Sequence, residues 1–132
     1  MTIEYVNPPD VHAPRGLYSH TVTVPAGTDL IFLSGQVGVQ ADGTTPSSIA
    51  EQADQVFANI VAHLKFHGLE PSSIIKLTTF MVAGQDGDAV RAARIKHLGS
   101  HRPASTAVFI AELVEPEWYV EVEAIAGKPR KP

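Results

Sequence analysis

The feature that most constrains the fold is the segment from Ser48 to His67, which carries the marks of an amphipathic helix at both ends. Ser48 followed by Glu51 forms a capping box, and Gly68 stands where a left-handed residue commonly ends a helix. Apolar residues recur with the spacing of a single helix face: Ile49, Ala53, Val56, Phe57, Ile60 and Leu64. The sequence therefore predicts a helix here whose apolar face packs against a second layer.

Strand patterns flank this helix on both sides. Residues 19–24 and 30–34 are β-prone and are separated by the turn sequence PAGTD, so we expect them to form a hairpin. Residues 72–83 carry apolar side chains on both faces, which is typical of a central strand covered on both sides. The remaining expected elements are a shorter helix over 87–98 and strands over 104–112 and 118–126.

The resulting order, ββαβαββ, predicts an α+β domain with both helices on one face of a mixed sheet. The other face is apolar at several positions and has no helix left to cover it, which favours a homo-oligomer with its sheets facing each other. We expect one domain over residues 1–132, with a proline-rich extended arm over 1–15 and a loose tail over 127–132.

The composition narrows the class of protein. Apolar residues make up 44% of the chain and charged residues 18%, which favours a compact globular domain. The formal net charge is −4, and the only basic cluster is the tail 128–131, so we expect no nucleic-acid partner. The chain has no cysteine, which excludes disulfides, thiolate zinc sites and thiol nucleophiles. Neither a signal peptide nor a membrane span is evident, so we expect a cytoplasmic protein without a membrane partner.

Six short motifs, in their order and spacing, resemble those of the Rid family (YjgF/YER057c/UK114). They cover about residues 16–126 and read GLYSH (16–20), FLSGQVG (32–38), EQADQVFANIVAHL (51–64), IIKLTTFMV (74–82), RPAST (102–106) and EVEAIA (121–126). The resemblance implies a chorismate-mutase-like fold and a homotrimer with its sheets facing inward. It also implies that small metabolites bind in clefts between adjacent subunits.

The resemblance assigns roles to particular residues. Tyr18 corresponds to a tyrosine that lines the cleft, and Ser34 and Gly35 correspond to a turn that faces it. Glu121 corresponds to the glutamate that positions or activates water, and His20 lies at a position near the cleft. In the deaminating members of the family, such groups hydrolyse reactive enamines and imines to ammonia and a 2-keto acid.

One position departs from the family pattern. Ser105 stands where the family has an arginine after Pro-Ala, which binds the carboxylate of an imino acid. A serine hydroxyl offers one neutral hydrogen bond instead of a bidentate guanidinium pair, and losing such a pair in a desolvated site costs on the order of 2–5 kcal/mol. We therefore expect the substrate to differ from the standard 2-imino acid. If another arginine replaces the missing one, Arg102 and Arg15 are favoured over Arg91 and Arg94.

Two histidine pairs have the spacing of one helical turn, His63 with His67 and His97 with His101. A metal site needs a third ligand and groups that orient the histidines, and the sequence indicates neither. Both pairs lie near a helix C-terminus, where a histidine interacts favourably with the helix dipole. We accordingly expect no metal and no other cofactor.

Each candidate residue also has an ordinary structural interpretation. Tyr18 would equally suit a subunit contact, Ser34 a strand-ending turn, and Glu121 with Glu123 a solvent-facing edge strand.

Three candidate functions are compatible with these residues. The first is a hydrolase that deaminates a small imine or enamine, with Glu121 as the catalytic residue and Tyr18, Ser34, Gly35, Ser105, Arg102 and His20 binding the substrate. The second is a trimer that binds a metabolite without turnover, and the third is a ribonuclease or translation inhibitor.

Overall fold

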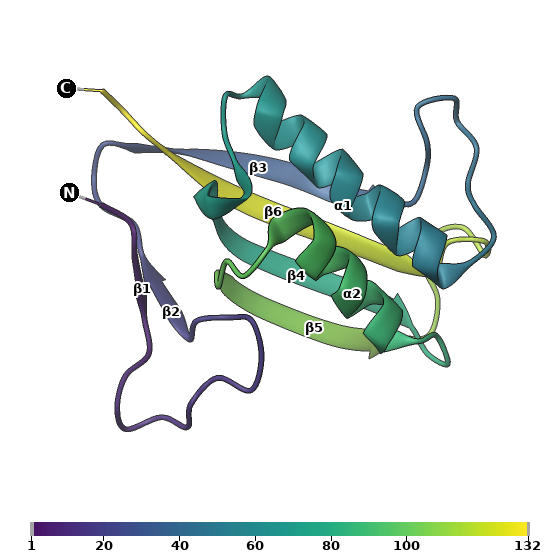
Figure 1. Ribbon diagram of the computed structural model, residues 1–132, viewed down its shortest axis with the longest axis horizontal. Helices are drawn as coiled ribbons and strands as arrows, with labels where there is room; N and C mark the ends of the chain where they lie inside the picture. The colour runs from purple at the N-terminus through teal and green to yellow at the C-terminus, as the bar shows by residue number, and fades with distance from the viewer. Residues whose placement is uncertain (1, 132) are drawn as a thin grey trace.

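The computed structural model describes residues 2–131 and consists of two helices on one face of a four-stranded sheet, beside a two-stranded ribbon (Figure 1). The elements are β1 (Glu4–Val6), β2 (Thr21–Thr23), β3 (Thr28–Val37), α1 (Ile49–Phe66), a short 3-10 helix (Pro71–Ser73), β4 (Ile74–Val82), α2 (Gly87–Leu98), β5 (Ala104–Ile110) and β6 (Val120–Pro129). The main sheet has the order β3-β6-β4-β5, in which only β4 and β5 are parallel. The α+β class and the mixed sheet are confirmed.

Helix α1 follows the sequence expectation closely. The Ser48 hydroxyl accepts a hydrogen bond from the backbone N–H of Glu51 at 3.2 Å, which caps the helix, and it donates one to the Glu51 carboxylate at 2.9 Å. Gly68 has the left-handed φ of +72° just after the helix. The apolar face is fully buried from Ala53 to Leu64 and packs against the sheet. Burial of this face is therefore what orients α1 on the sheet.

A buried glutamine, Gln52, adds a polar anchor that the apolar pattern does not indicate. Its side-chain nitrogen donates to the carbonyls of Pro46 at 2.9 Å and Glu117 at 2.8 Å, and its oxygen accepts from the N–H of Tyr119 at 2.8 Å. Because Gln52 is completely buried, these bonds tie the loop before α1 to the loop before β6.

The expected hairpin between residues 19–24 and 30–34 is wrong. β2 pairs with β1, whereas β3 pairs along its length with β6. The turn at Gly27, whose φ is +86°, separates two strands of very different length. The ten-residue β3 finds a partner of equal length in β6, and local β-propensity does not select between such partners.

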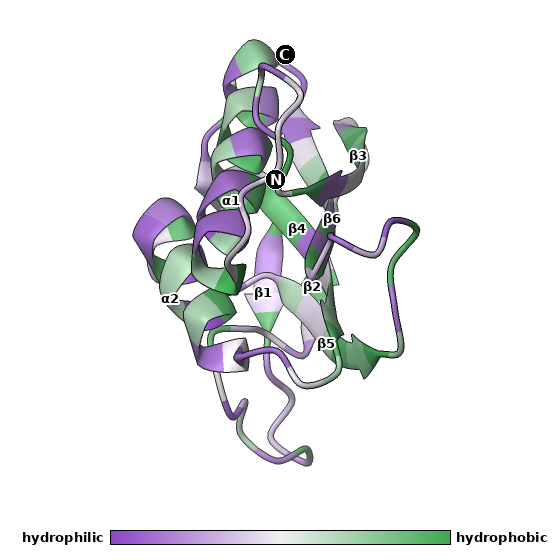
Figure 2. Ribbon diagram, turned by 90° about the vertical axis from the view of Figure 1, so that its right-hand side faces the viewer, coloured by the Kyte–Doolittle hydropathy of each residue, from purple (hydrophilic) through white to green (hydrophobic). Residues whose placement is uncertain are grey.

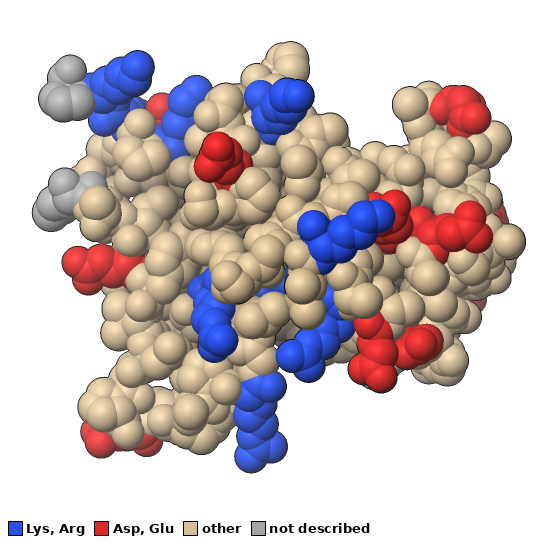
Figure 3. Space-filling view, in the orientation of Figure 1, with Lys and Arg blue, Asp and Glu red and all other residues tan. Residues whose placement is uncertain are grey.

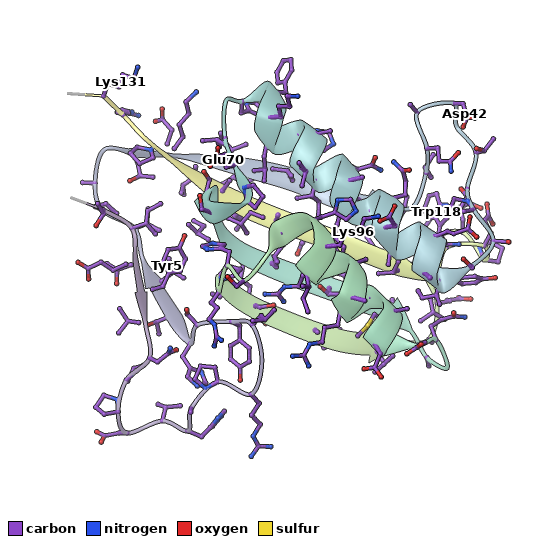
Figure 4. All side chains as sticks on the ribbon, in the orientation of Figure 1. Tyr5, Asp42, Glu70, Lys96, Trp118 and Lys131 are labelled. Carbon is purple, nitrogen blue, oxygen red and sulfur yellow. The ribbon has the colours of Figure 1, made fainter. Side chains whose placement is uncertain are left out.

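The two ends of the chain are more ordered than the sequence suggests. The segment for which we expect an extended arm contains β1, and Tyr5 on this strand donates its hydroxyl to the carbonyl of Ile74 at 3.2 Å. Figure 4 shows Tyr5 between the ribbon and the main sheet. At the other end β6 continues to Pro129, and the N–H of Arg130 bonds to the carbonyl of Gly27. Both ends are thus tied to the sheet.

Within residues 2–131, both helices lie over one face of the sheet and no helix lies over the other (Figure 1). In Figure 2 the helices lie on the left and the sheet on the right, with apolar segments on β3 and β5. Phe32 is 70% exposed, and Leu30 and Val108 are also exposed, although all three are large apolar residues. β4, expected to be covered on both sides, is therefore covered by helices on one side only. None of the helices within residues 2–131 is long and apolar enough to cross a membrane.

Candidate functional site

A cavity of about 260 Å³ lies between α2 and the inner face of the sheet at β4 and β5. Its apolar wall includes Phe57 from α1, Met81 from β4 and Val90 from α2. The lining also includes Ser105 on β5 and the loop of residues 16–18. Two of the expected site residues, Tyr18 and Ser105, are thus brought together in one cavity.

Arg94 reaches into this cavity from α2. Its guanidinium donates to the Ser105 hydroxyl at 3.3 Å and to the backbone carbonyl of Leu17. Burial lowers the pKa of this guanidinium, and the nearby charge of Arg91 lowers it further. An arginine therefore lies beside the very position where the family pattern has one, although it comes from a different element.

The sequence favours two other arginines, Arg102 and Arg15, for this role. The exposed Arg102 does not line the cavity, and its backbone carbonyl accepts a hydrogen bond from the Ser19 hydroxyl at 2.6 Å. Arg15 is exposed as well, and its backbone N–H donates to the Tyr18 hydroxyl at 3.2 Å. One sequence feature does indicate that Arg94 faces the sheet. It follows the buried Val90 by one helical turn, which places it on the inner face of α2.

His20 supports the loop that carries Tyr18 but does not line the cavity. One nitrogen of its ring bonds to the backbone carbonyl of His12 at 2.7 Å. The ring also meets the Tyr18 ring edge to face, with 5.5 Å between the ring centres. The bond to His12 ties His20 to an earlier part of the same loop. The ring contact then helps to position the Tyr18 side chain.

Glu121 lies on the opposite face of the sheet. Val120 and Val122 are buried toward the helices, so the intervening Glu121 points to the face without helices. There its carboxylate packs against Gly35, at a bulge of β3 that also includes Ser34. Ser34, Gly35 and Glu121 thus form one group, which the sheet separates from the cavity of Tyr18 and Ser105 within a single chain.

The two histidines of each pair do not point toward a common site. His97 bonds to the Asp54 carboxylate at 2.8 Å, and Lys96 bonds to the same carboxylate at 2.7 Å. Figure 4 shows Lys96 on α2 where the two helices meet. His63 contacts the side-chain oxygen of Gln36 at 3.1 Å, and His101 the carbonyl of Ile74 at 2.7 Å. Residues 2–131 contain no group of three His, Asp or Glu side chains suited to hold a metal ion.

The charges around the cavity are unbalanced. Arg91 and Arg94 both line it, and no Asp or Glu is among the residues that do. The space-filling view shows Lys and Arg side chains over α2 and the region below it, whereas most acidic side chains of that view lie toward the right-hand end (Figure 3). The arrangement favours a small anionic ligand with an apolar part.

Comparisons with known proteins agree with this architecture. The family model described as Endoribonuclease L-PSP matches residues 10–128. Protein HMF1 of Saccharomyces cerevisiae is 32% identical over 88% of this chain and 88% of its own length. A protein of Dermatophagoides farinae named 2-iminobutanoate/2-iminopropanoate deaminase is 30% identical over 91% of this chain and 92% of its own.

Solved structures share the fold. The yeast protein YEO7 is 30% identical and superposes with a TM-score of 0.70, covering 96% of this chain and 99% of its own. YyfB of Yersinia pestis, described as a protein of the conserved Rid family, superposes with a TM-score of 0.83 at 24% identity. That superposition covers 96% of this chain and 98% of YyfB, and at this identity it supports the fold alone.

Proposed function

The chain belongs to the Rid family, and on that premise we propose that it hydrolyses a small reactive imine or enamine metabolite, with release of ammonia. Relatives named 2-iminobutanoate/2-iminopropanoate deaminase and Reactive Intermediate Deaminase A support this reaction class. The observation that carries the proposal is the pair of groups on one chain: a cationic cavity around Arg94 and a carboxylate, Glu121, held against Gly35. One group suits substrate binding and the other suits activation of water.

We also propose that the active protein is a homotrimer. Within one chain the cavity and Glu121 lie on opposite faces of the sheet, so neither face alone holds a complete site. We therefore propose that a complete site takes Glu121 from one chain and the cavity from a neighbouring chain. The exposed side chains of Phe32, Leu30 and Val108 support packing of the face without helices against another copy, because exposed apolar patches usually mark partner surfaces.

The proposed reaction needs one proton acceptor and no cofactor. Glu121 takes a proton from water as the water oxygen attacks the imine carbon. The C–N bond then breaks, the nitrogen leaves as ammonia after protonation, and the product is a carbonyl compound.

The substrate that we propose differs from the standard 2-imino acid in how it is held. Ser105 offers a hydroxyl where the family pattern has a guanidinium, and the nearby guanidinium of Arg94 comes from α2. The direction from which the anion is held thus changes, and with it the orientation of the imine carbon relative to water.

The test generates imines in place with an amino-acid oxidase and measures ammonia release. We expect the wild-type protein to accelerate release and Glu121→Gln to reduce it about hundredfold, since removal of a general base has this order of effect. Glu123→Gln is the matched control, because Glu123 is exposed on the same strand two residues away and should leave the rate unchanged. A wild-type protein without any acceleration would contradict the proposal and favour the metabolite-binding alternative.

A ribonuclease function is the second alternative, because the matching family model carries the description Endoribonuclease L-PSP. The net charge of −4 weighs against it, since phosphate contacts from Lys and Arg supply most of the affinity for nucleic acid. Incubating the same preparations with RNA tests this alternative. Cleavage that persists in Glu121→Gln and follows the protein through purification would support it.

A further inference from the structure

The cavity beside α2 contains two arginines without an acidic counterpart. Arg91 and Arg94 both line it, and the ion pairs found within residues 2–131 include neither of them. A partly buried cation without a counter-ion is costly, because the protein interior solvates charge poorly. The lowered pKa of Arg94 reflects both its burial and the charge of Arg91. The site is therefore short of negative charge.

Arg94 is held in place instead of being free to turn outward. It bonds to the Ser105 hydroxyl on β5 and to the Leu17 carbonyl in the loop before Tyr18. A guanidinium has five N–H donors, and these two acceptors leave others for a ligand. Because these bonds already hold the Arg94 guanidinium in place, less conformational entropy is lost when its parallel N–H donors bind a carboxylate.

The small, uncharged side chain of Ser105 leaves room for the Arg94 guanidinium. An arginine at position 105 would bring a second guanidinium to the place where the Arg94 fork lies 3.3 Å from the serine oxygen. Two like charges at that distance repel, so a small hydroxyl residue is what allows Arg94 to take this place. The serine is thus part of an anion site built from another element.

Arg91 supplies a second positive charge to the same cavity. It lies one helical turn before Arg94, which places both side chains on neighbouring positions of α2, and it is the more exposed of the two. A ligand with one acidic group would leave one of these charges uncompensated. The apolar wall of Phe57, Met81 and Val90 suits a short carbon chain between two acidic groups.

We propose that the cavity binds a small dianion, specifically a dicarboxylate, with Arg94 holding the inner carboxylate and Arg91 the outer one. This inference rests on the proposed function, since it names the substrate class of that site. The substrate would be the imine of a dicarboxylic amino acid. Water adds to its imine carbon, the C–N bond breaks, and the products are a 2-oxo dicarboxylate and ammonia.

The test measures binding of two product-like probes to the full-length protein by calorimetry at constant ionic strength. The probes are 2-oxoglutarate, with two carboxylates, and 2-oxobutanoate, with one. We expect 2-oxoglutarate to bind on the order of tenfold more tightly, which is the effect of one additional modest ion pair. Arg91→Gln should abolish this preference, and Arg94→Gln should weaken both probes by about tenfold or more.

Two further variants keep the test decisive. Arg130→Gln removes the same charge from an arginine that pairs with Asp29 away from the cavity, and it should leave both affinities unchanged. The double variant Arg94→Gln with Ser105→Arg should regain binding of 2-oxobutanoate, which a merely structural role of Arg94 would not produce. Thermal melting identifies a variant that fails to fold, in which case Arg94→Lys, which keeps the charge and loses the fork, replaces Arg94→Gln.

The outcomes separate this inference from the proposed function. Equal affinity for the two probes, or a preference that survives Arg91→Gln, overturns the dicarboxylate assignment even if ammonia is released from other imines. A preference that depends on Arg91, without any ammonia release, supports the assignment and overturns the deaminase function. Faster hydrolysis of the imine from glutamate than of that from 2-aminobutyrate, lost in Arg91→Gln through a raised KM, supports both.

Discussion

The carboxylate of Glu121 occupies the space beside Gly35, with its Cδ 2.7 Å from the position that a β-carbon on residue 35 would take. Only glycine leaves room for this carboxylate at the bulge of β3. We therefore predict that Gly35→Ala displaces the Glu121 side chain. The rate of ammonia release should fall about tenfold, less than for Glu121→Gln, because the carboxylate is moved and not removed.

Stability distinguishes this effect from general damage. The atoms in the way are the end of a flexible side chain, so the melting temperature of Gly35→Ala should stay close to that of the wild type. Gly38 provides the contrast, since a β-carbon there would lie 2.8 Å from the Cα of Gln52 in the backbone of α1. Gly38→Ala should lower the melting temperature clearly. A full wild-type rate in Gly35→Ala would argue against a catalytic Glu121.

Replacing Gln52 with leucine should destabilise the protein strongly. The carbonyls of Pro46 and Glu117 and the N–H of Tyr119 would all lose their side-chain partner in a buried region. Leaving a buried polar group unpaired costs about 1–3 kcal/mol, and three groups lose their partner here. We therefore expect the free energy of unfolding to fall by at least about 3 kcal/mol. Urea denaturation of the wild type and the variant measures it.

The control for this prediction lies on the same helix. Gln55 is only half-buried and bonds to the side chain of Asn59 one turn later at 2.7 Å. Gln55→Leu should cost no more than about 0.5 kcal/mol, as is usual for such pairs on a helix surface. Similar losses in the two variants would mean that the three bonds of Gln52 contribute little.

The parts of the fold that the sequence predicts best are those determined by neighbours along the chain. The helix from Ile49 to Phe66 is predicted because its cap, its apolar stripe and its final glycine are all local signals. The pairing of β3 with β6 is not local, because it joins residues from 84 positions apart (Val37 and Glu121) to 101 positions apart (Thr28 and Pro129). Neither the turn at Gly27 nor β-propensity contains that information.

The candidate site shows the same division. Family motifs locate Tyr18, Ser105 and Glu121, but they do not show that the sheet separates Glu121 from the other two within one chain. Arg102 is favoured on the sequence because it is three positions from Ser105. Arg94 reaches Ser105 instead, because helix α2 packs over β5 and brings together residues that are eleven positions apart. Packing of this kind is a tertiary property that spacing alone does not predict.

Asp54 should make the protein's stability depend on acid pH. Hydrogen bonds from Lys96 and then from His97 lower the pKa of the Asp54 carboxyl below its ordinary value. Because the pKa is lower in the folded state, the stabilisation is fully present above the unfolded-state pKa and is lost as pH falls through the folded-state value. The carboxylate is 45% exposed, so its contribution at pH 7 should stay below about 1 kcal/mol.

The measurement compares the wild type with Asp54→Asn in denaturation experiments at several pH values. The variant should be slightly less stable at pH 7, and the difference should disappear at strongly acidic pH, where the wild-type carboxyl is protonated. Raised salt should reduce the difference at pH 7, because an exposed ion pair is screened. A difference that is the same at all pH values would mean that packing, and not charge, links α1 to α2 through Asp54.

The proposed trimer can be broken at Phe32. This side chain is 70% exposed on the face of the sheet without helices, where Leu30 on the same strand and Val108 on β5 are also exposed. Phe32→Glu would bury a carboxylate without a partner in that contact, so we expect monomers in size-exclusion chromatography with light scattering. Ammonia release should be lost as well, although Glu121 and Arg94 are both still present.

Phe66→Glu is the matched control. Phe66 is even more exposed, at 85%, but it lies at the end of α1 on the helix side, so the same substitution there should leave the trimer intact. If Phe32→Glu remains a trimer with full activity, the subunits do not meet through this face, and the cavity and Glu121 act without a neighbouring copy.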